Sequence, residues 1–334
     1  MSEMNTFRTR LATLASAAAL MIAATSGAAA QAEMPADLVA AAKAEGSLTV
    51  YTNVDPSLME KLSAAFTAAH GIKVDIQRQA SSALAQRFVA ENDTDNTIAD
   101  VYYSTDRAFH DDLFAKGLFS SVETVPGYAE WPQEAKSEGT ITIGYNPYSL
   151  VWNKDLVPNG LTSWEQLNDP AYEGQVILTD PRSSVTSNQF YKMLHDLYGD
   201  AFLEKLGSHA TYSPSAVPGI QQVAAGAQAI YAPGIHQVVT GLVASGAPLG
   251  ESFPEPSISS NNVASLVAKA PHANAAKLFV AFLMTKEAQA INNFDGFSPI
   301  EGIENTRTMP QIVNIEPTDA MAASEKIYQL MGLQ

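Results

Sequence analysis

Residues 47–103 read SLTVYTNVDPSLMEKLSAAFTAAHGIKVDIQRQASSALAQRFVAENDTDNTIADVYY, and this stretch decides the fold. Three short runs rich in β-branched and aromatic residues, at 47–51, 72–76 and 98–103, have the composition of strands. The segments between them carry apolar residues at helical spacing. This strand–helix–strand–helix–strand order predicts an α/β fold with a parallel sheet and helices on both of its faces.

A second set of strand and helix patterns follows the first. Strands are predicted at 175–179, 227–231 and 262–268, with helical patterns around them. The runs at 141–145 and 149–153 flank an Asn-Pro turn and predict strands that cross between the sets. Two such sets without a flexible linker predict two doubly wound sheets, one in each of two lobes, joined by two hinge strands.

The same patterns give expected boundaries. Lobe 1 is predicted to comprise residues 33–140 and 269–305, and lobe 2 residues 141–268, with hinge strands near 141–153 and 262–268. Residues 306–334 are expected to form a C-terminal helical segment that packs on lobe 2. The cleft between two lobes is the default place for a small-molecule ligand, and closure around it would be a hinge motion of a monomer.

The N-terminus has the pattern of a secretory signal peptide. Arg8 and Arg10 precede an uncharged run, and Ala30-Gln31-Ala32 forms an A-x-A cleavage site. The apolar run is too short for a comfortable membrane span, and no cysteine follows it that could carry a lipid. We therefore expect that residues 1–32 are removed and that the protein is exported to the periplasm without inserting into the membrane.

Composition argues against several function classes. A formal net charge of −16 disfavours nucleic-acid binding, which needs a basic surface. The chain has no cysteine, hence no disulfide and no cysteine nucleophile. It lacks the G-x-S-x-G and phosphate-loop motifs, and its six histidines do not have zinc-ligand spacing. The sequence therefore predicts a binding protein without cofactor rather than an enzyme, although catalytic residues brought together only by folding remain an alternative.

Small polar side chains follow the three predicted strands of the first set. Because the carboxyl ends of parallel strands share one edge, and ligands bind there, we expect these side chains to converge on a ligand. The adjoining helix N-termini expose unpaired N–H groups that suit an anion or a polar group. For each residue taken alone, helix capping is the alternative role. The predicted ligand-binding residues of this edge are Thr52, Asn53, Ser81, Ser82, Ser104 and Thr105.

Arg182 is the most informative charged residue of the second set. It falls between a predicted strand and a helix, among hydroxyl side chains. A guanidinium there can hold a carboxylate or phosphate through two parallel hydrogen bonds, so we expect Arg182 to anchor an anion. The alternative is that Arg182 pairs with Asp180 and fixes the turn. The predicted ligand-binding residues of this set are Tyr145, Arg182, Ser183, Ser184 and Tyr231, the two tyrosines as cleft walls.

Five stretches resemble motifs of ABC-importer solute-binding proteins of the ferric-ion-binding type. They span nearly the whole mature chain and are AEGSLTVY (44–51), ADVYYS (99–104), DPRSS (180–184), AGAQAI (225–230) and ANAAKLFVAFL (273–283). The DPRSS stretch resembles relatives that bind organic anions. The resemblance implies the two-lobed periplasmic-binding-protein fold of the type II kind, a closing cleft, and delivery of a small molecule to a membrane permease.

The ferric branch of this family typically binds iron with an adjacent tyrosine pair on the second lobe and a His and a Glu on the first. This chain has only Tyr231 in the corresponding second-lobe segment, with Asp55 near the His position and Thr105 at the Glu position. Fe(III) prefers several anionic oxygens. We therefore expect an organic anion, a phosphonate, phosphate ester or carboxylate. The first alternative is Fe³⁺ held by Asp55 and Tyr231 together with a bound anion, and the second is an enzyme on the same fold.

Overall fold

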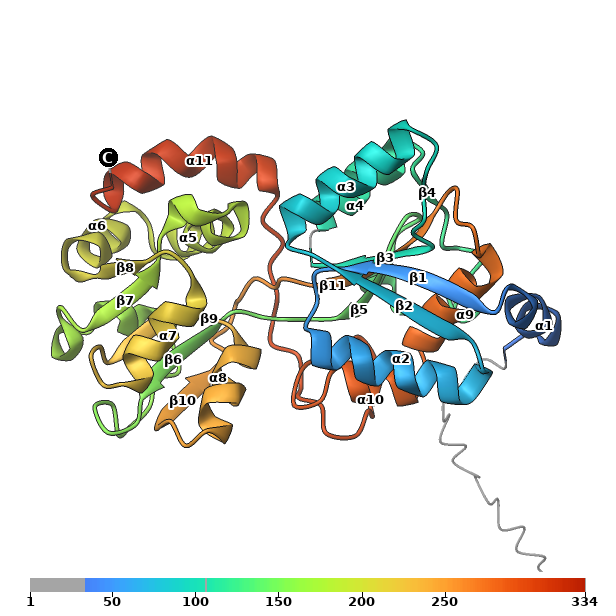
Figure 1. The fold of residues 1–334 in the computed structure, drawn as a ribbon. Helices are drawn as coiled ribbons and strands as arrows, with labels where there is room; N and C mark the ends of the chain where they lie inside the picture. Colours follow the sequence, from blue (N-terminus) through green and yellow to red (C-terminus); the bar gives the residue numbers. More distant parts are fainter. Residues whose placement is uncertain (1–33, 106, 334) are drawn as a thin grey trace, which may run out of the picture. The chain divides into compact units, whose positions relative to one another are not determined.

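The computed structural model describes residues 34–105 and 107–333 (Figure 1). The predicted signal peptide lies outside these residues. The described chain forms two mixed sheets, which confirms the predicted α/β class with two sheets. We call the six-stranded sheet with its helices the first lobe and the five-stranded sheet with its helices the second lobe.

The first lobe is built on strands in the order β2-β1-β3-β11-β4, with β5 pairing to β11. Its parallel part is β1, β2 and β3, whereas β11 runs antiparallel to its three partners. The strands are β1 (Ser47–Thr52), β2 (Lys73–Arg78), β3 (Val101–Ser104), β4 (Phe119–Ser120), β5 (Ile141–Gly144) and β11 (Asn262–Val267). The helices are α1 (Ala36–Glu45), α2 (Pro56–His70), α3 (Ser81–Asp93), α4 (Arg107–Ala115), α9 (Ala273–Leu283) and α10 (Lys286–Asn292), with the 3₁₀ turn η1 (Gln133–Ala135).

The second lobe has the strand order β10-β6-β9-β7-β8, with β7, β8 and β9 parallel. The strands are β6 (Ser149–Asn153), β7 (Val176–Thr179), β8 (Thr211–Ser213), β9 (Ile230–Gly234) and β10 (Leu249–Ser252). The helices are α5 (Val185–Tyr198), α6 (Asp200–His209), α7 (Ala216–Ala224), α8 (His236–Ala244) and α11 (Pro317–Leu330), with 3₁₀ turns η2 (Trp164–Asn168), η3 (Pro170–Tyr172) and η4 (Pro181–Ser183).

Strand pairing differs from the expected boundaries in one respect. Strands β5 and β11, which the sequence patterns placed within the second lobe as parts of hinge strands, pair with each other in the first sheet. The chain therefore passes between the sheets at residues 145–148 and 253–261. Residues 293–316 make a third passage, from α10 to α11, and α11 lies against α5 (Figure 1). Alternating apolar residues predict a strand but do not show which other strand it pairs with, and this explains the difference.

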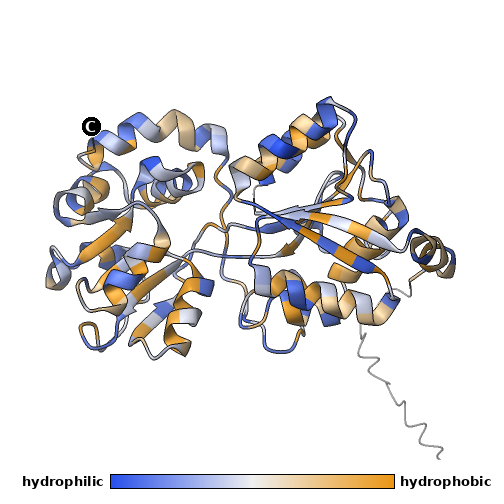
Figure 2. Cartoon of the chain, in the orientation of Figure 1, coloured by the Kyte–Doolittle hydropathy of each residue, from blue (hydrophilic) through white to orange (hydrophobic). Residues whose placement is uncertain are grey.

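Each lobe has its own apolar core. In the first lobe the rings of Phe66, Phe279 and Phe282 contact one another between α2 and α9. In the second lobe Trp164 is fully buried and its indole N–H donates to the Pro256 carbonyl at 2.9 Å. Figure 2 shows hydrophobic residues along strands of both sheets. The buried apolar residues of each lobe form clusters that they do not share with the other lobe. Each sheet therefore positions the polar residues at its own edge.

Candidate functional site

Three side chains converge at the carboxyl ends of β1 and β3 and the start of α3. The Asn53 amide nitrogen donates to the Ser81 hydroxyl at 2.8 Å and to the Thr105 hydroxyl at 3.0 Å. The Asn53 carbonyl oxygen accepts the Thr105 backbone N–H at 3.2 Å. The structure thus brings together three residues that the sequence placed on one edge. We call Asn53, Ser81 and Thr105 the polar triad.

The bonds within the polar triad decide what it can offer a ligand. The bond from the Thr105 backbone orients the Asn53 amide, so both of its N–H groups point at hydroxyl oxygens. Neither hydroxyl proton is used in these bonds, and each can therefore be donated onward. Helix α3 starts beside the triad after Ala80, which makes no side-chain cap. An array of O–H and N–H donors at a helix start favours a group with several acceptor oxygens, such as an oxyanion.

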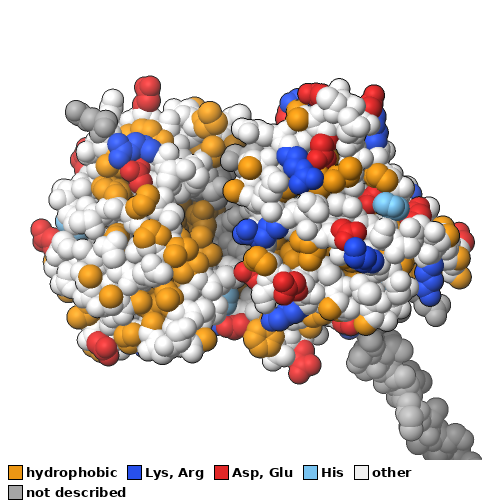
Figure 3. All heavy atoms as spheres, in the orientation of Figure 1, with side chains coloured by type: hydrophobic (Ala, Val, Ile, Leu, Met, Phe, Trp, Pro, Cys, Tyr) orange, Lys and Arg blue, Asp and Glu red, His pale blue; other side chains and the backbone are white. Residues whose placement is uncertain are grey.

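Arg78 adds a positive charge to the same edge, and the sequence analysis missed it. It ends β2, is exposed, and donates from Nε to the Val54 carbonyl at 2.9 Å. A bond through Nε positions the guanidinium without using its two terminal nitrogens. In the view of Figure 3 most Lys and Arg side chains lie on the first lobe. The signal that could have found Arg78 is the one applied to Arg182, an arginine between a strand and a helix.

The other predicted first-lobe residues have different roles. Thr52 is buried, and its hydroxyl accepts the Val54 N–H at 3.0 Å. Ser104 is also buried, with its hydroxyl 2.8 Å from Nε2 of His110. Both are engaged inside the lobe, so their hydroxyls do not face a ligand as expected. Ser82 lies in the first turn of α3, and Asp55 caps α2 by accepting the Leu58 N–H at 3.0 Å.

His110 explains why Ser104 is held inside. Its Nδ1 lies 2.8 Å from the Ser265 hydroxyl, which itself donates to the Gly139 carbonyl at 2.8 Å. Burial, with a smaller contribution from Arg107, lowers the pKa of His110 to about 3, so the ring is neutral. Because the single Ser265 proton goes to Gly139, Nδ1 carries the imidazole proton and Nε2 accepts from Ser104. In these hydrogen bonds the Ser104 hydroxyl donates to His110 inside the lobe.

The predicted second-lobe residues lie at the end of β7 and the start of α5. Arg182 pairs with Asp180 through Nε to Oδ1 at 2.9 Å and Nη2 to Oδ2 at 2.7 Å, and this hydrogen-bonded pair lowers the pKa of Asp180. The pairing matches the alternative role predicted for Arg182. Ser184 caps α5 by accepting the Ser187 N–H at 3.0 Å, and Ser183 contacts the Ser187 hydroxyl at 3.2 Å.

Of the two predicted cleft tyrosines, Tyr231 is placed differently from the expectation. Tyr231 is fully buried, and its hydroxyl is hydrogen-bonded to that of Thr179. Its ring lies so close to α7 that a Cβ at Gly219 would overlap Cε2 of Tyr231. Burial raises the pKa of Tyr231, which opposes the phenolate that a ferric ion would need. Tyr145 is partly buried and joins the first lobe through its N–H, which donates to the Phe297 carbonyl at 3.0 Å.

Comparison with known proteins assigns the chain to a family. Residues 47–298 match the family model of the bacterial extracellular solute-binding proteins. The chain belongs to this family. It is an extracellular solute-binding protein, and its fold has two lobes as the sequence predicted. No described helix of this solute-binding protein is long and apolar enough to cross a membrane.

Solved structures share the fold of this solute-binding protein. An extracellular solute-binding protein from Bordetella parapertussis has a TM-score of 0.71 at 18% identity, and 86% of this chain and 98% of that chain are covered. Iron-bound HitA from Pseudomonas aeruginosa has a TM-score of 0.67 at 18% identity, with the same coverage. The Trichodesmium protein IdiA (FutA), in complex with iron and citrate, has a TM-score of 0.69 at 17% identity, again with 86% and 98% covered. Likeness at this identity establishes the fold alone.

One curated relative of the chain is named as an iron uptake protein. The solute-binding protein is 29% identical over 150 residues to the Iron uptake protein A1 of Synechocystis. The match covers 44% of this chain and 40% of the relative's length. Among the described residues no group of three or more His, Cys, Asp or Glu could hold a metal ion.

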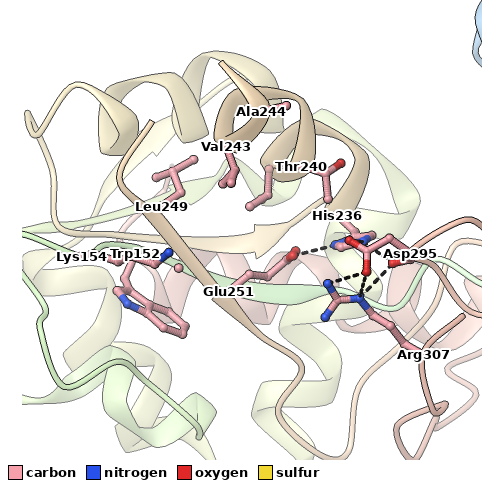
Figure 4. Close-up of a pocket in the computed structure, with 12 residues that line it drawn as sticks. Trp152, Lys154, His236, Thr240, Val243, Ala244, Leu249, Glu251, Asp295 and Arg307 are labelled. Carbon is pink, nitrogen blue, oxygen red and sulfur yellow. Dashed lines mark hydrogen bonds and ion pairs between the residues drawn. The ribbon is translucent and has the colours of Figure 1, made fainter. Parts of the chain in front are cut away.

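A cavity of about 480 Å³ lies along α8 and the edge strand β10 of the solute-binding protein (Figure 4). At its polar end Nδ1 of His236 lies 2.6 Å from Oε2 of Glu251, and Nε2 lies 2.5 Å from the Asp295 carbonyl. Arg307 pairs with the Asp295 carboxylate at 2.8 Å. These groups are bonded to one another, and they tie α8 of the second lobe to the segment that follows α10. We assign them this structural role rather than solute binding.

Proposed function

We propose that this protein is the periplasmic receptor of its ABC importer and that it captures its solute by an oxyanion group. The observation that carries the proposal is the polar triad, in which the Asn53 amide donates to the Ser81 and Thr105 hydroxyls and leaves both hydroxyl protons for other acceptors. Arg78 on the same edge supplies the compensating positive charge. Ligands of open α/β sheets bind outside these strand ends, which supports the placement. The captured solute would then pass to the membrane permease.

We propose a ferric complex of an organic acid as the cargo, with the free organic acid as the second candidate. The iron-uptake relative favours iron over the free anion that the sequence alone favoured. Among the described residues no group of three or more His, Cys, Asp or Glu could hold a bare ferric ion, whereas a chelating acid brings oxygen donors with it. A carboxylate oxygen of the chelator that does not bind the iron would meet the polar triad. Citrate is the first chelator to test, because it accompanies iron in the Trichodesmium structure.

Calorimetric titration with citrate and with ferric citrate tests the cargo. Ferric citrate is expected to bind with at least a tenfold lower Kd than citrate, because the ferric ion orders the chelator's oxygens before binding. Metal analysis of the protein after gel filtration should find one iron per chain. Equal binding of both forms would favour the free organic acid. Absence of binding by citrate, ferric citrate and methylphosphonate would contradict capture by an oxyanion.

We also propose that the protein is a monomer that closes on its solute. In the described part of the chain the backbone passes between the sheets at 145–148, 253–261 and 293–316, and these segments lie outside the helices and strands, so they can absorb the backbone rotation of a hinge. Small-angle scattering should give the mass of a single chain and a smaller radius of gyration at saturating solute. An unchanged radius with bound solute would argue against closure, and a doubled mass against the monomer.

A further inference from the structure

Three exposed apolar side chains stand at the starts of three second-lobe helices. Val185 opens α5 and is 44% exposed, Val217 lies in the first turn of α7 and is 48% exposed, and Ile235 directly precedes α8 and is 37% exposed. These helices follow β7, β8 and β9, which are parallel. The three residues therefore belong to the edge formed by the carboxyl ends of these strands. We call Val185, Val217 and Ile235 the apolar edge.

Helix formation does not require apolar residues at these positions. Polar residues are preferred where a helix begins, and β-branched residues have a lower helix propensity than unbranched ones. A single exposed valine needs no explanation, because more than half of a protein's surface is apolar. Three exposed apolar side chains on the edge where a parallel sheet binds ligands do need an explanation. Hydrophobic side chains are numerous on the second lobe in Figure 3.

The two strand-end edges differ in chemistry. The first-lobe edge carries the polar triad and Arg78, which suit an oxyanion, whereas the second-lobe edge exposes branched hydrocarbon. Arg182, the charged group of the second edge, is paired with Asp180. A solute composed only of polar groups would leave the apolar edge without complementary surface. A solute that combines an oxyanion with hydrocarbon would match both edges.

We infer that the solute is amphiphilic: its organic part carries an apolar body of several carbons that packs on the apolar edge. The inference rests on the proposed function, because it assumes that the oxyanion is held at the first-lobe edge. It applies equally to a free organic acid and to an organic acid that chelates ferric iron. Burial of hydrocarbon gives up to about a fourfold gain in affinity per methylene.

The test uses a series of α-hydroxy acids, each with one carboxylate and the same iron-chelating head. Lactate, 2-hydroxybutanoate and 2-hydroxyhexanoate are titrated with and without ferric iron. We expect Kd to fall about two- to fourfold for each added methylene. The double variant Val185→Thr, Val217→Thr keeps the β-branched shape and should flatten this dependence on chain length. Val243→Thr is the matched control, because Val243 is 42% exposed in α8 but lies outside the apolar edge.

The outcomes separate this inference from the proposed function. Affinity that rises with chain length in the parent and in Val243→Thr, but not in the double variant, supports the apolar edge. Equal affinity for all three acids overturns the inference and leaves oxyanion capture standing. A dependence on chain length that persists in the double variant overturns the assignment to these residues. If no acid binds with or without iron, oxyanion capture fails, and the inference fails with it. Unchanged thermal unfolding midpoints would show that the variants are folded.

Discussion

Arg78→Gln is expected to weaken solute binding about ten- to hundredfold without unfolding the protein. Arg78 is the last residue of β2 and lies on the same edge as the polar triad, and the hydrogen bond from its Nε to the Val54 carbonyl holds the guanidinium in place. A charge-assisted bidentate contact contributes about 1.5–3 kcal/mol, and each 1.4 kcal/mol changes Kd tenfold. Arg78→Lys should restore only part of the affinity, because an ammonium group lacks the planar fork. Calorimetric titration with ferric citrate and citrate measures the effect.

Two further variants sharpen this experiment. Lys73→Gln removes a charge at the opposite end of β2, where Lys73 pairs with Asp75, and should leave the affinity unchanged. Arg182→Gln examines the anchor that the sequence alone proposed. Because Arg182 is already paired with Asp180, we expect its removal to change Kd less than about threefold and to act mainly on the turn. A large loss in Arg182→Gln together with normal binding by Arg78→Gln would reverse the two assignments.

Asp100→Ala is expected to destabilise the first lobe by about 3–5 kcal/mol, which is a large part of the stability of most domains. Asp100 is fully buried, and its carboxylate accepts the backbone N–H of His272 at 2.6 Å and that of Thr49 at 2.7 Å. These bonds join β1 to the segment that leads into α9. Alanine would leave a carboxylate-sized void and two N–H groups without their acceptor, and buried N–H groups without partners are costly.

Urea unfolding followed by circular dichroism measures this effect. Asp100→Asn should be less damaging, because its carbonyl oxygen still accepts one of the two N–H groups. Asp112→Ala is the matched control, because its carboxylate is half exposed and pairs only at the surface with Lys116. A midpoint for Asp100→Ala equal to that of the parent would show that the two hydrogen bonds to the Asp100 carboxylate do not stabilise the lobe. Solute binding by folded Asp100→Ala should be normal, since Asp100 directly precedes β3, whereas the polar triad lies at the carboxyl end of that strand.

Local patterns in the sequence predicted the elements. The strands of the segment 47–103 and the helices between them appear as β1, α2, β2, α3 and β3, because apolar periodicity and turn residues act over a few neighbours. Parallel order then followed from general rules of chain connection, and with it the expectation that Asn53, Ser81 and Thr105 share an edge. Two strand–helix sets without a flexible linker predicted the two lobes, which the family resemblance also implied and the comparisons confirmed.

Only the tertiary structure decided which of the predicted side chains remain available to a solute. The sequence could not show that Thr52, Ser104 and Tyr231 are buried and bonded within their lobes, nor that Arg182 is paired while Arg78 stands beside the polar triad. It also could not assign β5 and β11 to the first sheet. Burial and hydrogen bonding depend on partners far apart in the chain, such as Asn53 and Thr105 or His110 and Ser265. Residue type and local periodicity do not show which distant residues become such partners. The sequence therefore predicted the helices and strands, but not which side chains at the sheet edges are free to bind a solute.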